Sequence, residues 1–431
     1  MNRRSFLKCA ANSGIALSCL PWIANAQTSV HNGELLLVIS ANGGWDTSLY
    51  IDPKVNISGE LPITNWSRDG SIQKAGNIAY APIINNESFF KKFADRTLVI
   101  NGVDTQTNSH STGANHTFSG RNSEGFPSLP AIFAATHAPN IPFATLNLGG
   151  FSKTANIIAG VNLRQGRALR SVVNKDNVMP DGSKLRQDFE TNLILKAQQE
   201  SFAYLNTQKT SLLPKYMRAI EQFNTAQKLS PGLEPFLDIL PNDNNYQPSV
   251  GLGSGSSDAL TNAQLILLSF KAGVTASASM AAGGFYDSHQ DNDNSQYILL
   301  EHLNDTLEYI WDYSQELGIA DRLTVLVSSD FCRTPHYNTQ NGKDHWPTNS
   351  YMVMRKNAPW ANQVIGETDA IQNAKRINPT SLAIEDSASS IIMSPGHIHK
   401  ALRHELGISG SDYDTQFNFQ LLEDVALFTT G

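Results

Sequence analysis

The segment Leu323–Asp330 constrains the fold more than any other part of this sequence. Its residues, LTVLVSSD, form a run of apolar and β-branched side chains that is typical of a strand buried on both faces of a parallel sheet. The run ends on an acid. Because open α/β sheets carry their chemistry at the carboxyl ends of the strands, Asp330 lies where a catalytic or metal-binding carboxylate is expected. An Asp that caps a turn or helix after the strand is the alternative interpretation.

The same alternation of buried strands and helices recurs along the chain, so the sequence predicts an α/β fold with a mostly parallel central sheet between helices. We expect strands at 34–40, 97–101, 143–148, 274–280 and 351–354, and helices at 128–137, 262–272, 295–318 and 396–406. Residues 180–257 are polar and helical in pattern and then rich in Pro, Asn, Gly and Ser. They are interpreted as a helical insertion or cap with a flexible return, within a single domain of residues 27–431.

Acids and imidazoles follow three of the expected strands. Asp46 comes after the first, Asp287 and His289 come after the strand at 274–280, and Asp330 ends the Leu323 strand. Asp344 and His345 follow after a loop that is long enough to fold back over the strand end. Since a parallel sheet gathers its strand ends along one edge, we expect these side chains to converge on one or two divalent ions, Zn²⁺, Mn²⁺ or Fe²⁺. The alternative is that each Asp is an ordinary turn residue.

One neighbouring residue has two interpretations, and others have one. Arg333 could hold a tetraoxo anion through parallel hydrogen bonds, or it could form a structural salt bridge to a nearby acid. His110 and His116 are expected in a loop, and Cys332 is expected to be a packed thiol. The histidines of the last helix, His397, His399 and His404, are expected to be solvated.

Residues 1–26 have the features of an export signal. Arg3-Arg4 precedes a modestly apolar run and Ala24-Asn25-Ala26, so we expect twin-arginine export to the periplasm or beyond and removal of this segment. A lipoprotein cut before Cys19 is the alternative. Removal takes the formal charge from −7 to −10, because Arg3, Arg4 and Lys8 are lost. An acidic chain without basic clusters is not expected to bind nucleic acid, and no transmembrane span is expected.

Six motifs together resemble those of domain-of-unknown-function family 1501, twin-arginine-exported proteins of alkaline-phosphatase-like fold. They are Arg3-Arg4-x-Phe6-Leu7-Lys8, Gly43-Gly-x-Asp46, Ser109-His110, Gly284-Phe-x-Asp287-x-His289, Ser329-Asp-Phe-x-Arg-Thr-Pro335 and Asp344-His-Trp-Pro347. The resemblance implies a two-metal site for phosphate or sulfate esters. On that pattern Asp46 and Asp330 would hold one metal, while Asp287, His289 and His345 would hold the other.

The sequence departs at three places from the pattern that is usual in the alkaline phosphatase superfamily. Phe331 stands where an imidazole usually follows the strand acid, Asp287 and His289 are closer than the usual spacing, and His110 falls at the nucleophile position between Ser109 and Ser111. We therefore expect an exported metal-dependent hydrolase of a phospho- or sulfo-ester, on a small molecule or glycan. Either a metal-activated water or a serine beside His110 would be the nucleophile. The alternative is a non-catalytic metal-binding or structural protein that retains the fold. A cofactor oxidoreductase would need a dinucleotide fingerprint or a cluster of cysteines, and neither is present.

Overall fold

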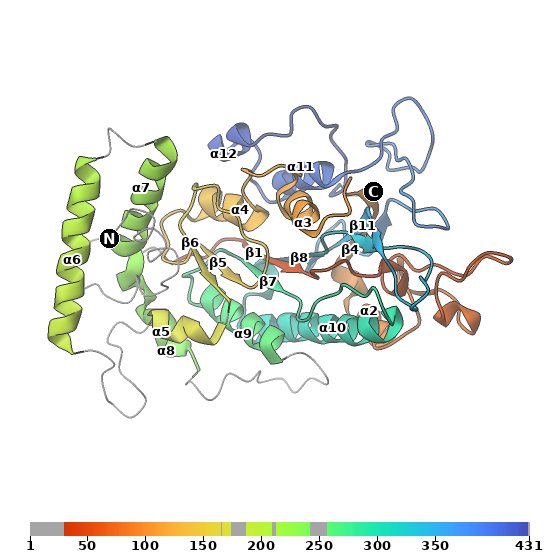
Figure 1. The fold of residues 1–431 in the computed structure, drawn as a ribbon, viewed down its shortest axis with the longest axis horizontal. Coiled ribbons are helices and arrows are strands. Elements are labelled where there is room, and N and C mark those ends of the chain that lie inside the picture. The colour runs from red at the N-terminus through yellow and green to blue at the C-terminus, as the bar shows by residue number, and fades with distance from the viewer. Residues whose placement is uncertain (1–29, 165, 174–186, 209–212, 242–256, 430–431) are drawn as a thin grey trace.

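One eight-stranded sheet forms the centre of the computed structural model, which describes residues 30–164, 166–173, 187–208, 213–241 and 257–429 (Figure 1). The strand order is β12-β4-β11-β8-β1-β7-β5-β6. Seven strands run in the same direction, and β11 is antiparallel to its neighbours β4 and β8. The strands are β1 (Leu35–Ser40), β4 (Thr97–Asp104), β5 (Thr145–Leu148), β6 (Gly160–Leu163), β7 (Ser277–Ala281), β8 (Leu323–Ser328), β11 (Thr348–Arg355) and β12 (Gln363–Ile365). The predicted mostly parallel α/β sheet is thus confirmed.

Helices cover both faces of this sheet, which explains why its central strands are continuously apolar. Along β1, the side chains of Leu35, Leu37 and Ile39 join one core, and those of Leu36 and Val38 join the other. The first core lies under α2 (Asn86–Phe93), α9 (Ser257–Lys271) and α10 (Asn292–Glu316), and the second lies under α4 (Leu129–His137) and α11 (Pro395–Glu405). Figure 1 shows these two groups of helices on opposite sides of the strands. Each fully buried aliphatic side chain contributes about 1.5–3 kcal/mol, so both faces stabilise the sheet.

The helix at 110–119 was not predicted. The segment with His110 and His116, expected to be a loop, forms α3 (His110–Ser119) against α11. Ser, Thr, Asn, His and Gly have weak helix propensity, so the local sequence gives little signal. Close packing explains the glycine at position 113, because a Cβ there would lie 2.6 Å from the carbonyl oxygen of Asp330. Close packing against the end of β8 therefore stabilises α3 where propensity does not.

The described part of residues 180–257 is helical. It contains α6 (Asp188–Thr207), α7 (Pro214–Leu229) and α8 (Glu234–Ile239), and Figure 1 shows α6 and α7 beyond the β6 edge of the sheet. The Pro-, Asn-, Gly- and Ser-rich part at 231–257, expected to hold a flexible return, contains α8, and its residues 242–256 lie outside the described residues. The expected signal segment at 1–26 also lies outside them. Among the helices that are described, none is long and apolar enough to cross a membrane.

Six further short elements complete the described fold. They are β2 (Gln73–Ala75), β3 (Ile78–Tyr80), α5 (Leu169–Val173), β9 (Cys332–Arg333), β10 (His345–Trp346) and α12 (Asp412–Gln416). The Cys332 thiol is buried, as predicted, and burial raises its pKa to about 11. His397 and His399 were expected to be solvated, but both are buried because α11 packs against α3.

Candidate metal centre

A short ribbon brings His345 back to the end of β8. Cys332–Arg333 of β9 pairs antiparallel with His345–Trp346 of β10, so the loop between them folds over the strand end as the sequence predicted. The loop that follows β7 carries Asp287 and His289 to the same place, and α3 begins there with His110. Residues from three distant parts of the chain therefore meet at the carboxyl edge of the sheet.

Each of the three imidazoles has its Nδ1 fixed by an oxygen acceptor. His110 Nδ1 lies 2.6 Å from Asp330 Oδ2, and His289 Nδ1 lies 2.8 Å from Asp344 Oδ1. His345 Nδ1 lies 2.8 Å from the carbonyl oxygen of Asn108. A carbonyl or an ionised carboxylate can only accept, so Nδ1 donates in each case and Nε2 of each neutral ring is left as a bare lone pair. Metal-binding histidines are oriented in this way by acceptors outside the ligand shell.

The three Nε2 atoms converge on the carboxylate of Asp287. His289 Nε2 lies 3.0 Å from Asp287 Oδ1 and 3.0 Å from His345 Nε2, and His345 Nε2 lies 3.3 Å from Asp287 Oδ1. His110 Nε2 lies 3.6 Å from Asp287 Oδ2, is shielded from solvent, and has no hydrogen-bond partner. Ligand atoms of His110, Asp287 and His345 all lie within 4.8 Å of one another.

These separations fit a tetrahedral divalent ion. Ligands 2.0–2.1 Å from Zn²⁺ lie about 3.3 Å from one another at tetrahedral angles. Facing lone pairs on the neutral rings of His289 and His345 repel each other, and a metal ion or a proton between the two Nε2 atoms relieves this repulsion. The four side chains His110, Asp287, His289 and His345, here called the metal centre, therefore provide a suitable donor set for Zn²⁺, Mn²⁺ or Fe²⁺.

The metal centre has an aromatic floor and an open side. The ring of Phe331, which is buried, lies 4.8 Å from that of His110 and 4.6 Å from that of His345. The His289 side chain is 45% exposed, and Phe285 beside His110 is 60% exposed. Phe331 thus supplies packing where the superfamily pattern has a ligand, while solvent reaches the centre from the side of His289.

Arg333 is built into the wall of the centre. Its guanidinium is fully buried and donates to the carbonyl oxygens of Gly43, Gly44 and Lys343 and, over 2.6 Å, to Asp287 Oδ1. Burial alone would raise the pKa of Asp287, but the Arg333 hydrogen bond and charge outweigh it and lower that pKa. Arg333 thus forms the structural salt bridge to a nearby acid, which was one of its two predicted roles. Its other hydrogen bonds go to backbone carbonyl oxygens inside the protein.

Two glycines make this wall possible. Gly43 and Gly44 have φ of 109° and 85°, a conformation that glycine adopts without strain. A Cβ on Gly43 would lie 2.7 Å from the backbone nitrogen of Asp287, and one on Gly44 would lie 2.9 Å from Arg333 Nη2. The β1 loop can therefore pass between Asp287 and Arg333 only with glycine at both positions.

The structure does not bring Asp46 to the metal centre. Its carboxylate, fully buried, accepts from Ser48 N at 3.1 Å, Ser48 Oγ at 2.6 Å, Asn292 Nδ2 at 2.9 Å and Lys343 Nζ at 2.7 Å. A carboxylate has about four lone-pair positions, so these four donors leave none for a metal. Asp46 also caps the short helical turn Thr47–Leu49.

The other predicted site residues lie around the centre. Asp330 and Asp344, expected as metal ligands, hydrogen-bond the Nδ1 atoms of His110 and His289. Ser109 and Ser111 are exposed, and their hydroxyls lie 3.4 Å apart. The hydrogen bond to Asp330 is the main reason that the pKa of His110 is raised. Asp330 and Asp344 thus hold imidazoles in place, and the serines flank the entry to α3.

The match to a protein family covers residues 73–407, which include all four residues of the metal centre and begin after Asp46. The chain belongs to DUF1501, a family of proteins of unknown function. The comparison with curated proteins finds no match.

Several solved structures are similar to this DUF1501 chain over most of its length. The lipoteichoic acid synthase LtaP from Listeria monocytogenes is 9% identical, with 90% of this chain and 77% of that chain covered and a TM-score of 0.38. The alkaline phosphatase from the Antarctic bacterium TAB5 is 11% identical, covering 78% and 95%, with a TM-score of 0.33. The phosphonate monoester hydrolase of Agrobacterium radiobacter is 13% identical, covering 87% and 74%, with a TM-score of 0.35. At these scores the likeness carries no argument about activity.

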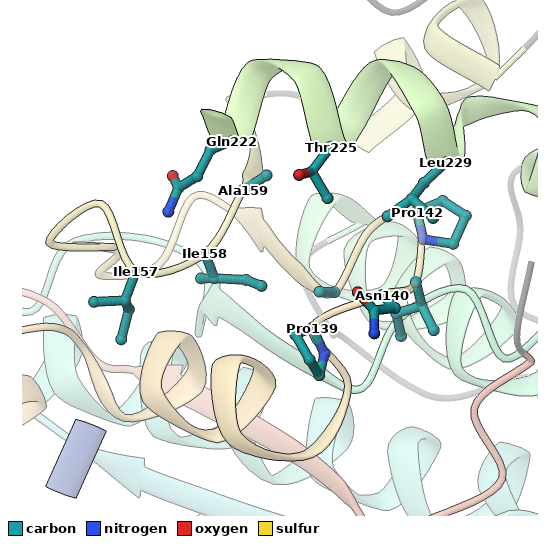
Figure 2. Close-up of a pocket in the computed structure, with 11 residues that line it drawn as sticks. Pro139, Asn140, Pro142, Ile157, Ile158, Ala159, Gln222, Thr225 and Leu229 are labelled. Carbon is teal, nitrogen blue, oxygen red and sulfur yellow. The ribbon is translucent and has the colours of Figure 1, made fainter. Parts of the chain in front are cut away.

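One cavity of the described structure lies away from the metal centre. A cavity of about 200 Å³ lies between α7 and the segments that lead into β5 and β6. Figure 2 shows Gln222, Thr225 and Leu229 of α7 facing Pro139–Pro142 and Ile157–Ala159. Those segments precede their strands, so the cavity is at the amino edge of the sheet and α7 does not cover the metal centre there.

Two functional residues escaped the sequence analysis. Lys343 neutralises Asp46, and the backbone carbonyl of Asn108 orients His345. The only sequence signal for Lys343 is its position directly before Asp344-His345, which is equally typical of a solvated lysine. A backbone carbonyl leaves no signal in the residue type.

Proposed function

We propose that this DUF1501 protein is an exported metal-dependent hydrolase of phosphate or sulfate esters. The observation that carries the proposal is the convergence of three imidazole Nε2 atoms on Asp287, each with its Nδ1 fixed by an oxygen acceptor. A divalent ion bound there would polarise an ester oxygen and supply a nucleophilic water at neutral pH. The chain's own part is to hold these ligands in place before substrate arrives.

The surroundings of the centre suit an anionic ester group. The helix α3 begins at His110, so the positive end of its dipole lies at the centre and favours a negatively charged oxygen. The exposed ring of Phe285 provides an apolar surface next to His110 for the rest of the substrate. Hydrolysis would join a water oxygen to phosphorus or sulfur and release the alcohol, which takes a proton from that water.

Export is part of the proposal and rests on the sequence. Arg3-Arg4 and the apolar run before Ala24-Asn25-Ala26 support passage through the twin-arginine translocase to the periplasm or the medium. That route carries folded proteins, so the centre could be loaded before export.

A non-catalytic metal-binding protein is the second candidate function. Arg333 favours it, because its guanidinium is buried and committed to Asp287 and backbone carbonyls, so it does not reach out to grip a substrate anion. An ester hydrolase would then have to hold its anion with the metal and α3 alone.

The two candidates are separated by turnover of p-nitrophenyl phosphate and p-nitrophenyl sulfate. The purified protein would be loaded with Zn²⁺ or Mn²⁺, treated with a chelator, and then reloaded, with His345→Ala as the inactive control. The hydrolase predicts turnover that is lost with the chelator and in the variant and is restored on reloading. Metal binding at full occupancy without turnover of either ester would favour the non-catalytic protein.

A further inference from the structure

We infer that the site takes a single divalent ion, and that the ammonium group of Lys343 serves as a built-in cation where a two-metal site would need a second ion. The inference deepens the proposed function and rests on it for the metal, but it concerns the number of ions and the residues that hold them. It departs from the two-ion arrangement that the family resemblance implies.

Lys343 lies beside Asp46, the carboxylate that the two-ion pattern would assign to a second metal. Its Nζ lies 2.7 Å from Asp46 Oδ2 and 3.1 Å from Ser48 Oγ, and it faces the ring of Tyr337 at 5.0 Å. The Lys343 and Asp46 side chains are both fully buried. A metal at Asp46 would have to displace this ammonium group and leave it without a charge partner inside the protein, which is strongly unfavourable.

The other half of the expected second site is also occupied. Asp330 was paired with Asp46 in the two-ion pattern, but its Oδ2 is 2.6 Å from His110 Nδ1. Its Oδ1 accepts from Gly43 N at 3.1 Å and from Ser329 Oγ at 2.8 Å. Asp330 is therefore committed to orienting a ligand of the first ion.

Charge balance gives an independent argument for one ion. Asp46 is neutralised by Lys343, and Asp287 is neutralised by Arg333. Asp330 and Asp344 remain, each hydrogen-bonded to an imidazole, with a combined charge of −2 when ionised. One divalent ion with three neutral imidazoles cancels that charge, whereas two ions would leave an excess of +2 at a partly buried place.

The geometry also accommodates one ion only. The His289, His345 and Asp287 ligand atoms lie 3.0–3.3 Å apart, and His110 Nε2 lies 3.6 Å from the other Asp287 oxygen. That is the spacing of ligands around one ion, since two ions in a paired site lie about 3.5–4 Å apart and need separate ligands. Among the described residues, His110, Asp287 and His345 form the group whose possible ligand atoms all lie within 4.8 Å of one another.

The test is a metal titration that needs no turnover. Chelator-treated protein would be titrated with Zn²⁺ or Mn²⁺ alone, and the number of ions bound per chain would be read by calorimetry and native mass spectrometry. We expect one ion in the wild-type protein. The matched variant Asp46→Asn/Lys343→Met, which replaces the ion pair with neutral side chains of similar size, should also bind one. His345→Ala should lose the ion.

Two results would overturn the inference. One is a second ion in the wild-type protein with an affinity near that of the first, and the other is the loss of an ion in Asp46→Asn/Lys343→Met while circular dichroism shows a folded chain. Either result leaves ester hydrolysis possible, so it is distinct from failure of the proposed function. Conversely, one bound ion without turnover would support the inference and contradict the hydrolase.

Discussion

Asp46 and Asp287 follow neighbouring strands of the same sheet, yet the protein treats the two carboxylates differently. Asp46 is fully buried and saturated by four donors, one of them the ammonium group of Lys343. Asp287 is partly exposed; its Oδ1 accepts from Arg333 and lies next to His289 and His345, and its Oδ2 faces His110. The comparison teaches that an acid at a strand end is available to a metal only if the fold leaves some of its lone pairs free.

The largest expected effect is the loss of Zn²⁺ affinity when His345, which lies beside Asp287, is removed. His345→Ala should lower the affinity for Zn²⁺ by more than about 100-fold, because removal of a residue that only orients a ligand already costs 10–100-fold. Calorimetric titration measures the change, and His404→Ala, an exposed histidine of α11, is the matched control. Equal affinities in the two variants would show that His345 is not a ligand.

The next largest effect is expected on the free energy of unfolding, when the ion pair between Lys343 and Asp46 is broken. Lys343→Met should lower the free energy of unfolding by about 3–5 kcal/mol, because it leaves Asp46 buried without its counter-charge. Urea unfolding followed by circular dichroism gives this number. Asp46→Asn/Lys343→Met should recover most of the loss. If Lys343→Met alone lost less than about 1 kcal/mol, the pair would not be a buried structural ion pair of the kind described.

A smaller effect is expected where an acid supports an imidazole. Asp344→Asn keeps an acceptor for His289 Nδ1 but removes the charge, so Zn²⁺ affinity should fall about 10-fold, at the lower end of effects on ligand-orienting residues. Stability should hardly change, since Asp344 is on the surface. The exposed Asp386→Asn is the control for a generic loss of negative charge. A Zn²⁺ affinity of Asp344→Asn equal to that of the control would remove Asp344 from the site.

The smallest effect is expected from the serines beside His110. Ser109→Ala/Ser111→Ala should leave Zn²⁺ affinity unchanged and alter stability by less than about 0.5 kcal/mol, because both side chains are exposed. If water is the nucleophile, turnover of p-nitrophenyl phosphate also persists in this variant. Loss of turnover with metal still bound would instead identify a serine as the nucleophile.

The sequence predicted the sheet and three of the four residues of the metal centre, because both depend on local patterns. Continuous apolar runs mark strands buried on both faces, and the strand ends then place Asp287, His289, Asp330 and His345 at one edge. These four residues do meet: Asp287 and His289 lie beside His345 of the β10 ribbon, and Asp330 is the hydrogen-bond partner of His110.

The rest depends on contacts that no local pattern encodes. His110 enters the centre because α3 packs at Gly113 against the carbonyl oxygen of Asp330, although α3 has weak helix propensity. Asp46 is withdrawn from the centre by Lys343, which is distant in sequence and has no feature that distinguishes it from a surface lysine. Tertiary packing thus decides which acids have lone pairs that face the metal centre.

The most direct test of the metal centre is X-ray diffraction from crystals of Zn²⁺-loaded protein, collected at the zinc absorption edge. The structure predicts a single anomalous peak about 2.0–2.2 Å from Nε2 of His110, His289 and His345 and from an oxygen of Asp287, with Lys343 still paired to Asp46. A peak at Asp46 with Lys343 displaced, or no peak among these four residues, would contradict the account.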